Sequence, residues 1–181
     1  MAMKSLKEMQ ETALDATKPG TVNPVEMLRL EALTSFEKYT KLMFKCQYKR
    51  SFIVAEHHKK MFEVLQDVVD GKITRLIINI APRYGKTELV IKSFISWAFA
   101  LNPRCRFLHL SYSDILVNDN SDTVRNIMSE ELYKTLFPNS ALASEKGSAK
   151  RWKTKAGGEL YAVSTPVSYT HLRAHETLAN L

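Results

Sequence analysis

The residues with the clearest chemical potential lie in Pro82–Thr87, which reads Pro-Arg-Tyr-Gly-Lys-Thr. Gly85 permits a tight turn, because a residue without Cβ adopts positive φ freely. Backbone N–H groups, and the N-terminus of a helix that follows, can then bind phosphate oxygens. Lys86 can reach the β- and γ-phosphates of a nucleoside triphosphate, and the Thr87 hydroxyl can ligate Mg²⁺. The pattern therefore predicts a P-loop that binds ATP and Mg²⁺.

One element of the usual P-loop pattern is missing from this segment. The first glycine would fall at position 80, which is Ile. A Gly-Lys-Thr triplet also arises by chance in about one chain in ten of this size at average composition. The triplet alone therefore leaves open a helix that merely starts with these residues, and the flanking elements have to decide.

The flanking elements favour the P-loop interpretation. Arg75–Ile80 is a short, Ile-rich apolar run, which is typical of a strand buried on both faces of a parallel sheet. The helix predicted over Lys86–Ala100 is apolar nearly all round, so we expect it to be buried. Asn102-Pro103 ends it, and a second strand is predicted at Arg106–Leu110. This order predicts a right-handed βαβ unit in an α/β fold: a P-loop NTPase-type three-layer sandwich with a central parallel sheet, here incomplete.

The remaining elements follow from periodicity and turn signals. Apolar residues recur at near-helical spacing over 28–43 and on one face of a helix over His57–Asp70. Ser113–Phe137 is also helical in pattern, and the polar stretch Asn118–Ser121 is expected to interrupt it. Alternating residues on both sides of Gly157-Gly158 predict a β-hairpin.

Composition limits the class of protein. The chain has 181 residues, 45% of them hydrophobic and 25% charged, which suits one soluble domain. A net charge of +7 is compatible with a polyanionic partner such as nucleic acid. Cys46 and Cys105 have no metal-type spacing, so we expect free thiols in a reducing cytoplasm. Met1–Thr17 is no signal peptide, and the longest apolar stretch, Phe94–Leu101, is too short to span a bilayer.

Over Met27–Val163, the loop included, the sequence resembles the ATPase domain of tailed-phage terminase large subunits. The loop of that family typically reads Pro-Arg-x-Gly-Lys-Ser/Thr without the first glycine, as Pro82–Thr87 does. Further matching residues are His57, His58, Leu65, Gly71, Arg75–Ile80, Trp97, Asn102, Pro103, Phe107, Ser111–Ser113, Asn120, Ser121, Val124, Arg125, Leu136, Phe137, Pro138, Trp152, Gly157, Gly158 and Tyr161–Val163.

The resemblance implies an enzyme that hydrolyses ATP to pump double-stranded DNA into a procapsid. It implies a homo-oligomeric ring in the host bacterial cytoplasm, with the portal protein and the small terminase subunit as partners and no membrane. The nuclease activity of the family lies in a separate C-terminal domain.

Roles for the loop residues follow from the same resemblance. Lys86 and Arg83 are the implied catalytic residues, and Thr87 is the implied Mg²⁺ ligand. The implied ATP contacts are Pro82, Arg83, Tyr84, Gly85, Lys86 and Thr87. A solvated loop charge is the alternative role for Arg83.

Two further groups of residues keep open alternatives. His57, His58 and Tyr84 either approach the adenine or serve packing and surface capping. Ser111–Ser113 follows the second strand at the end where α/β sheets place ligand loops, but core packing of Tyr112 is equally compatible with the sequence.

The sequence departs from the family pattern after about Val163. An ATPase of this class needs an apolar strand that ends in carboxylates for Mg²⁺ and for the attacking water, and no such strand follows Thr87. We therefore expect a chain truncated before that strand, which binds nucleotide and is inactive on its own. The last residues resemble translated adapter or vector sequence, with a divergent natural tail as the alternative. In the first case His171 and His175 are not metal ligands.

These considerations predict three parts: an N-terminal extension at Met1–Thr21, a partial P-loop ATPase domain at 22–165 and a non-native tail at 166–181. Two other functions remain open. One is a different P-loop ATPase that acts on nucleic acid, such as a helicase. The other is a basic binding module in which Gly-Lys-Thr is incidental. Nucleotide binding separates this module from both ATPases.

Overall fold

In the computed structural model, which describes residues 23–143 and 148–165, the chain forms a mixed α/β fold that is 57% helical and has one three-stranded sheet. The predicted α/β class is confirmed at this level. The expected extension at Met1–Thr21 and the expected tail at 166–181 lie outside the described residues. The helices are α2 (Pro24–Thr34), α3 (Phe36–Tyr48), α4 (Glu56–Val69), the π-helix η1 (Glu88–Ser93), α5 (Phe94–Leu101), α6 (Asp114–Ser129), α7 (Glu131–Leu136) and the 3₁₀ turn η2 (Pro138–Ser140). The strands are β1 (Arg106–Ser111), β2 (Arg151–Lys153) and β3 (Glu159–Ser164).

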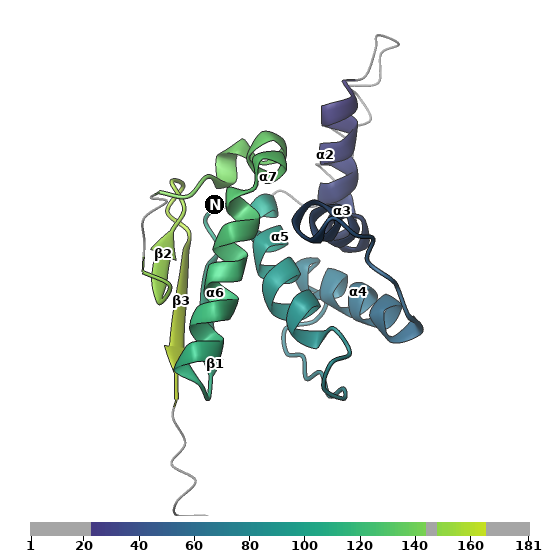
Figure 1. Cartoon of the computed structure of the whole chain (residues 1–181). Coiled ribbons are helices and arrows are strands. Elements are labelled where there is room, and N and C mark those ends of the chain that lie inside the picture. The colour runs from purple at the N-terminus through teal and green to yellow at the C-terminus, as the bar shows by residue number, and fades with distance from the viewer. Residues whose placement is uncertain (1–22, 144–147, 166–181) are drawn as a thin grey trace, which may run out of the picture.

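Helix α5 lies in the hydrophobic core, as its apolar sequence predicts. Trp97 and Phe99 are fully buried, and burial of each such side chain stabilises the fold by roughly 1.5–3 kcal/mol. Two polar side chains beside α5 are hydrogen-bonded within the core. The Trp97 Nε1–H donates to the Ala32 carbonyl at 2.9 Å, and the Tyr39 hydroxyl donates to Ser96 Oγ at 2.8 Å. These contacts join α5 to the N-terminal helices α2 and α3 (Figure 1).

The sheet has the order β1-β3-β2, with β1 parallel and β2 antiparallel to β3. Alternate residues point to opposite faces of a strand, and Leu160 and Ala162 are buried on the face covered by α6 (Figure 1). The opposite face carries Leu108, Leu110 and Tyr161, which are about half exposed. Among the described residues no helix covers this second face, so the expected three-layer sandwich is not confirmed.

The prediction of a central strand at Arg75–Ile80 is wrong. Within the described residues the segment pairs with no strand, and its Ile77 side chain is 94% exposed. A strand requires a hydrogen-bonded neighbour, because its N–H and C=O groups point sideways. Leu76 and Ile78 instead lie across a cavity from β1, so the two segments do not reach each other. The apolar composition of Arg75–Ile80 is suited to a buried strand that this fold does not build.

The helical prediction over Ser113–Phe137 is confirmed, but the break is misplaced. The chain is helical through Asn118–Ser121 and is interrupted at Glu130, between α6 and α7. Two polar residues of the stretch, Asn120 and Ser121, contact polar groups on the strands, which makes them compatible with a buried helix face. Ser121 Oγ accepts a hydrogen bond from the indole N–H of Trp152, which lies on β2.

The β-hairpin at Gly157-Gly158 is confirmed by the antiparallel pairing of β2 and β3. Gly157 has a φ of 93°, a conformation that side chains with a Cβ rarely adopt. A Cβ at Gly158 would collide with the carbonyl oxygens of Pro103 and Cys105. Both glycines are therefore required by the local backbone.

The predicted helix at His57–Asp70 is confirmed as α4, with Met61, Phe62 and Leu65 buried. Both cysteines, Cys46 and Cys105, are free thiols. Within the described residues, none of the helices combines the length and the apolar character needed to cross a membrane.

Candidate nucleotide-binding loop

The Pro82–Thr87 segment forms an exposed loop that runs directly into a helix. The Gly85 carbonyl accepts the N–H of Leu89 at 3.0 Å, so helical hydrogen bonding begins inside the motif. The helix starts as the π-helix η1, and π-turns are frequent at functional sites. Helix α5 follows η1 directly and is buried, so the C-terminal end of the loop is attached to the hydrophobic core.

Two loop residues adopt the left-handed backbone conformation. Gly85 has a φ of 78°, as the motif predicts for its glycine, and Arg83 has a φ of 68°. The left-handed conformation costs a residue with a Cβ about 1–2 kcal/mol. The surrounding contacts must therefore hold Arg83 in place, as is usual for strain at functional sites.

The N-terminus of α4 supplies such a contact. His58 Nδ1 accepts the Ala55 N–H at 3.0 Å, and its Nε2 lies 3.3 Å from the Tyr84 carbonyl oxygen. A Cβ at Gly85 would lie 2.8 Å from the same Nε2, so glycine is needed here for packing as well as for backbone conformation. Burial, with a smaller contribution from the neighbouring His57, lowers the pKa of His58.

The structure brings His57, His58 and Tyr84 together. The ring centroids of His57 and Tyr84 lie 5.3 Å apart, and those of His57 and His58 lie 3.9 Å apart. His57 Nε2 is buried and has no hydrogen-bond partner within the described residues. Tyr84 is about half exposed. The three rings therefore form one cluster that joins the N-terminus of α4 to the loop.

Lys86 and Thr87 line a cavity of about 500 Å³. Its wall is mainly apolar and is built by α4, the 75–80 segment, η1, α5 and β1. The other lining residues are Leu65, Val68, Leu76, Ile78, Val90, Ile91, Phe94, Ile95, Phe107, Leu108 and His109. None of these is an Asp or a Glu. The cavity therefore offers a cation and a hydroxyl, but no carboxylate from the described residues.

Two acidic residues, Glu88 next to the loop and Glu159 on β3, bind partners outside the cavity. The Glu88 carboxylate accepts hydrogen bonds from Lys92 Nζ at 3.0 Å and from the Tyr48 hydroxyl at 3.3 Å. Glu159 on β3 forms an ion pair with Arg151 on β2. Neither residue lines the cavity.

His109 is a cavity residue that the sequence analysis did not single out. It is buried on β1, and its Nε2 lies 3.4 Å from Asn120 Nδ2 on α6. Burial lowers the pKa of His109. Strand alternation could have identified it, since it shares the inward face of β1 with Phe107.

The residues after β1 serve a local structural role. Ser113 Oγ accepts the Leu116 N–H at 3.4 Å and caps α6. Tyr112 is 65% exposed, so its ring does not pack in the core, and that alternative is wrong. Neither residue lines the cavity beside Lys86.

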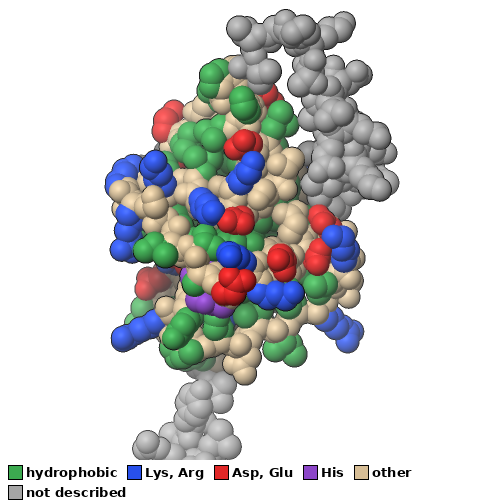
Figure 2. Space-filling model, turned by 90° about the vertical axis from the view of Figure 1, so that its right-hand side faces the viewer, with side chains coloured by type: hydrophobic (Ala, Val, Ile, Leu, Met, Phe, Trp, Pro, Cys, Tyr) green, Lys and Arg blue, Asp and Glu red, His purple; other side chains and the backbone are tan. Residues whose placement is uncertain are grey.

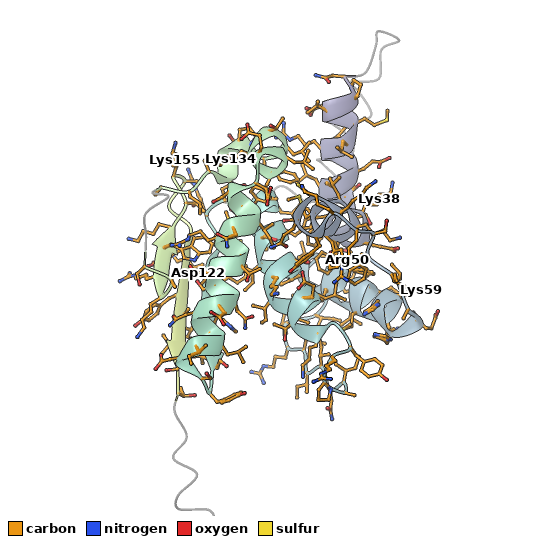
Figure 3. The ribbon with its side chains drawn as sticks, in the orientation of Figure 1. Lys38, Arg50, Lys59, Asp122, Lys134 and Lys155 are labelled. Atoms are coloured by element: carbon orange, nitrogen blue, oxygen red, sulfur yellow. The ribbon has the colours of Figure 1, made fainter. Side chains whose placement is uncertain are left out.

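The net charge of +7 does not by itself locate a basic surface. Figure 2 shows Lys and Arg side chains interspersed with Asp and Glu over the face that it views. The basic residues labelled in Figure 3 come from α3, α4, α7 and the turns of the chain, spread over the molecule. Lys38 forms an ion pair with Glu31, and Lys59 forms one with Glu56. The net charge alone therefore marks no nucleic-acid surface.

The one metal ligand that the sequence predicts, Thr87, lies in the loop. Over residues 23–143 and 148–165 there is no cluster of three or more His, Cys, Asp or Glu side chains arranged for a metal ion. The predicted Mg²⁺ ligand, Thr87, is a single oxygen ligand. Mg²⁺ commonly binds with few protein oxygens and completes its shell with phosphates and water, so the one ligand is compatible with a nucleotide-borne ion.

Comparison of the chain with models of protein families, with curated proteins and with solved structures finds no match. The assignment of the loop therefore depends on its own residues and geometry.

Proposed function

We propose that this chain is the nucleotide-binding part of an ATP-driven motor, similar to the ATPase domain of phage terminase large subunits. The observation that carries the proposal is the loop itself. Gly85 takes the left-handed conformation, a buried helix follows directly, and Lys86 and Thr87 line one cavity beside it. The residues that resemble the terminase family over Met27–Val163 support the choice of family.

Each loop residue has a proposed task in binding. Backbone N–H groups of the loop and of the helix start donate to phosphate oxygens, where the positive end of the helix dipole favours an anion. The Lys86 ammonium offsets the charge of the β- and γ-phosphates. The Thr87 hydroxyl would hold Mg²⁺, which would supply positive charge to offset that of the phosphates. Arg83 is exposed beside the site and contacts the γ-phosphate in this scheme.

Hydrolysis requires more than the described residues supply. Phosphoryl transfer depends on an oriented water and on a fully ligated Mg²⁺. Because the residues that line the cavity include no carboxylate, we propose that this chain binds Mg-ATP and turns it over very slowly. Translocation of double-stranded DNA, ring assembly and contacts with a portal protein and a small subunit are proposed for the complete motor, from the resemblance.

The proposal is tested by titration calorimetry of the 181-residue chain with Mg-ATP. Lys86→Ala should abolish measurable binding, because it removes the one side-chain charge on the cavity wall. Lys155→Ala is the matched control: it removes a lysine from the turn between β2 and β3, away from the loop (Figure 3), and should leave affinity unchanged.

The alternatives predict different results. Equal affinity of Lys86→Ala and wild type would exclude the loop as the binding site. No binding by the wild-type chain would favour a basic module in which Gly-Lys-Thr is incidental.

A further inference from the structure

The loop is tied to helix α4 by one side chain. His58 lies in the first turn of α4, 26 residues before Tyr84 in the chain, and its Nε2 lies 3.3 Å from the Tyr84 carbonyl oxygen. Tyr84 stands between the two left-handed residues, Arg83 and Gly85. The contact is therefore made at the most conformationally constrained point of the loop.

The hydrogen bonds of His58 define which ring nitrogen carries the proton. Its Nδ1 accepts the backbone N–H of Ala55, so Nδ1 is unprotonated. In a neutral imidazole the proton then resides on Nε2, which donates to the Tyr84 carbonyl. One ring thus accepts from the start of α4 and donates to the loop at the same time.

We propose that His58 is a positioning residue that holds the Pro82–Thr87 loop in its phosphate-binding conformation and thereby sets its nucleotide affinity. The inference rests on the proposed function. The Tyr84 carbonyl is held toward α4, which fixes the peptide that joins it to Gly85. The N–H of Gly85 belongs to that same peptide, so its direction is fixed as well. An oriented N–H group binds an anion without first losing conformational freedom.

The packing of Gly85 against His58 supports the same role. A methyl group at residue 85 would lie 2.8 Å from His58 Nε2, closer than carbon and nitrogen approach without a shift. The loop backbone and the imidazole are therefore fitted to each other. A ring that only capped α4 would need no such approach.

Two substitutions divide the functions of the ring. His58→Asn keeps a short acceptor for the Ala55 N–H but is too short to reach the Tyr84 carbonyl. His58→Gln has an amide donor that can reach the Tyr84 carbonyl but gives up the ring acceptor for Ala55. If His58 positions the loop, His58→Gln should preserve the affinity for Mg-ATP and His58→Asn should lower it. A role only in capping α4 predicts the reverse order.

The first readout is calorimetry with Mg-ATP, with Lys86→Ala as the control for the site. His58→Asn should raise the Kd about three- to tenfold, the loss expected for one hydrogen bond, while His58→Gln stays within about twofold of wild type. The second readout needs no nucleotide. Arg83 is exposed, and the rate of tryptic cleavage after it, followed by mass spectrometry, reports loop mobility. Cleavage should be faster in His58→Asn and unchanged in His58→Gln.

The outcomes separate this inference from the proposed function. If the wild-type chain binds Mg-ATP through Lys86 and His58→Asn matches it in Kd and cleavage, the inference is overturned and the function stands. If the wild-type chain binds no Mg-ATP, both are overturned, whatever the cleavage rates. If both variants cleave at the wild-type rate, His58 does not hold the loop. Circular dichroism at 25 °C confirms that each variant is folded before these comparisons are made.

Discussion

Replacing Arg83 by glycine should make the chain more stable and at the same time weaken its binding of Mg-ATP. Arg83 has a φ of 68° in the candidate loop, where its side chain is exposed. Glycine adopts this conformation without a steric penalty. The substitution therefore removes strain from the folded state and removes the proposed γ-phosphate contact.

The magnitude follows from two opposing contributions. Relief of the left-handed conformation contributes about 1–2 kcal/mol to the free energy of unfolding. The greater freedom of glycine in the unfolded chain subtracts about 0.5–1 kcal/mol. The net gain is about 0–1.5 kcal/mol, and its midpoint of about 0.75 kcal/mol corresponds to an increase in Tm of about 1.5–3 °C for a chain of this size.

Lys49 provides a matched control. It has a φ of 55° directly after α3, is exposed, and lies outside the loop. Lys49→Gly should raise the Tm by a similar amount and leave the affinity for Mg-ATP unchanged. Thermal unfolding followed by circular dichroism, with calorimetry of each variant, measures both quantities. A lower Tm for Arg83→Gly would refute the strain argument, and wild-type affinity in Arg83→Gly would remove Arg83 from the site.

Three further predictions concern pH, turnover and the end of the chain. The pKa values of His58 and His109 are lowered by burial, so the unfolded chain takes up protons before the folded one as the pH falls below about 6.5. The free energy of unfolding in urea should therefore be smaller at pH 5.5 than at pH 7.5, with a weaker pH dependence in His109→Gln; equal values would show that neither site resists protonation. A phosphate-release assay should detect no sustained turnover, whereas release that depends on Lys86 at a motor-like rate would place a catalytic carboxylate within the chain. Deleting Pro166–Leu181 should leave the Tm unchanged, and a clear decrease would show that these residues belong to the fold.

Much of the fold was predictable because the signals are local. The all-round apolar sequence of Phe94–Leu101 predicts a buried helix, and α5 is the centre of the core. The Gly157-Gly158 pair predicts the hairpin that joins β2 to β3, because the turn needs residues without a Cβ. The loop motif predicts a positive φ at Gly85, which is observed.

The predictions that were wrong depended on distant partners. Arg75–Ile80 has the composition of a buried strand, but strand formation also requires a neighbour, which composition does not specify. Asn118–Ser121 was expected to interrupt a helix, yet Ser121 is satisfied by Trp152, which lies 31 residues away in the sequence. The contact of His58 with the loop joins residues that are 26 positions apart, so a local sequence pattern could not predict it either.

The central claim is that Mg-ATP binds at the backbone of the Pro82–Thr87 loop. The most direct measurement is a titration of the ¹⁵N-labelled chain with Mg-ATP, followed through its backbone amide resonances. The account predicts that the largest shifts cluster at Tyr84, Gly85, Lys86 and Thr87, and that they disappear in Lys86→Ala. Shifts centred elsewhere, or loop amides that do not respond at saturating nucleotide, would contradict it.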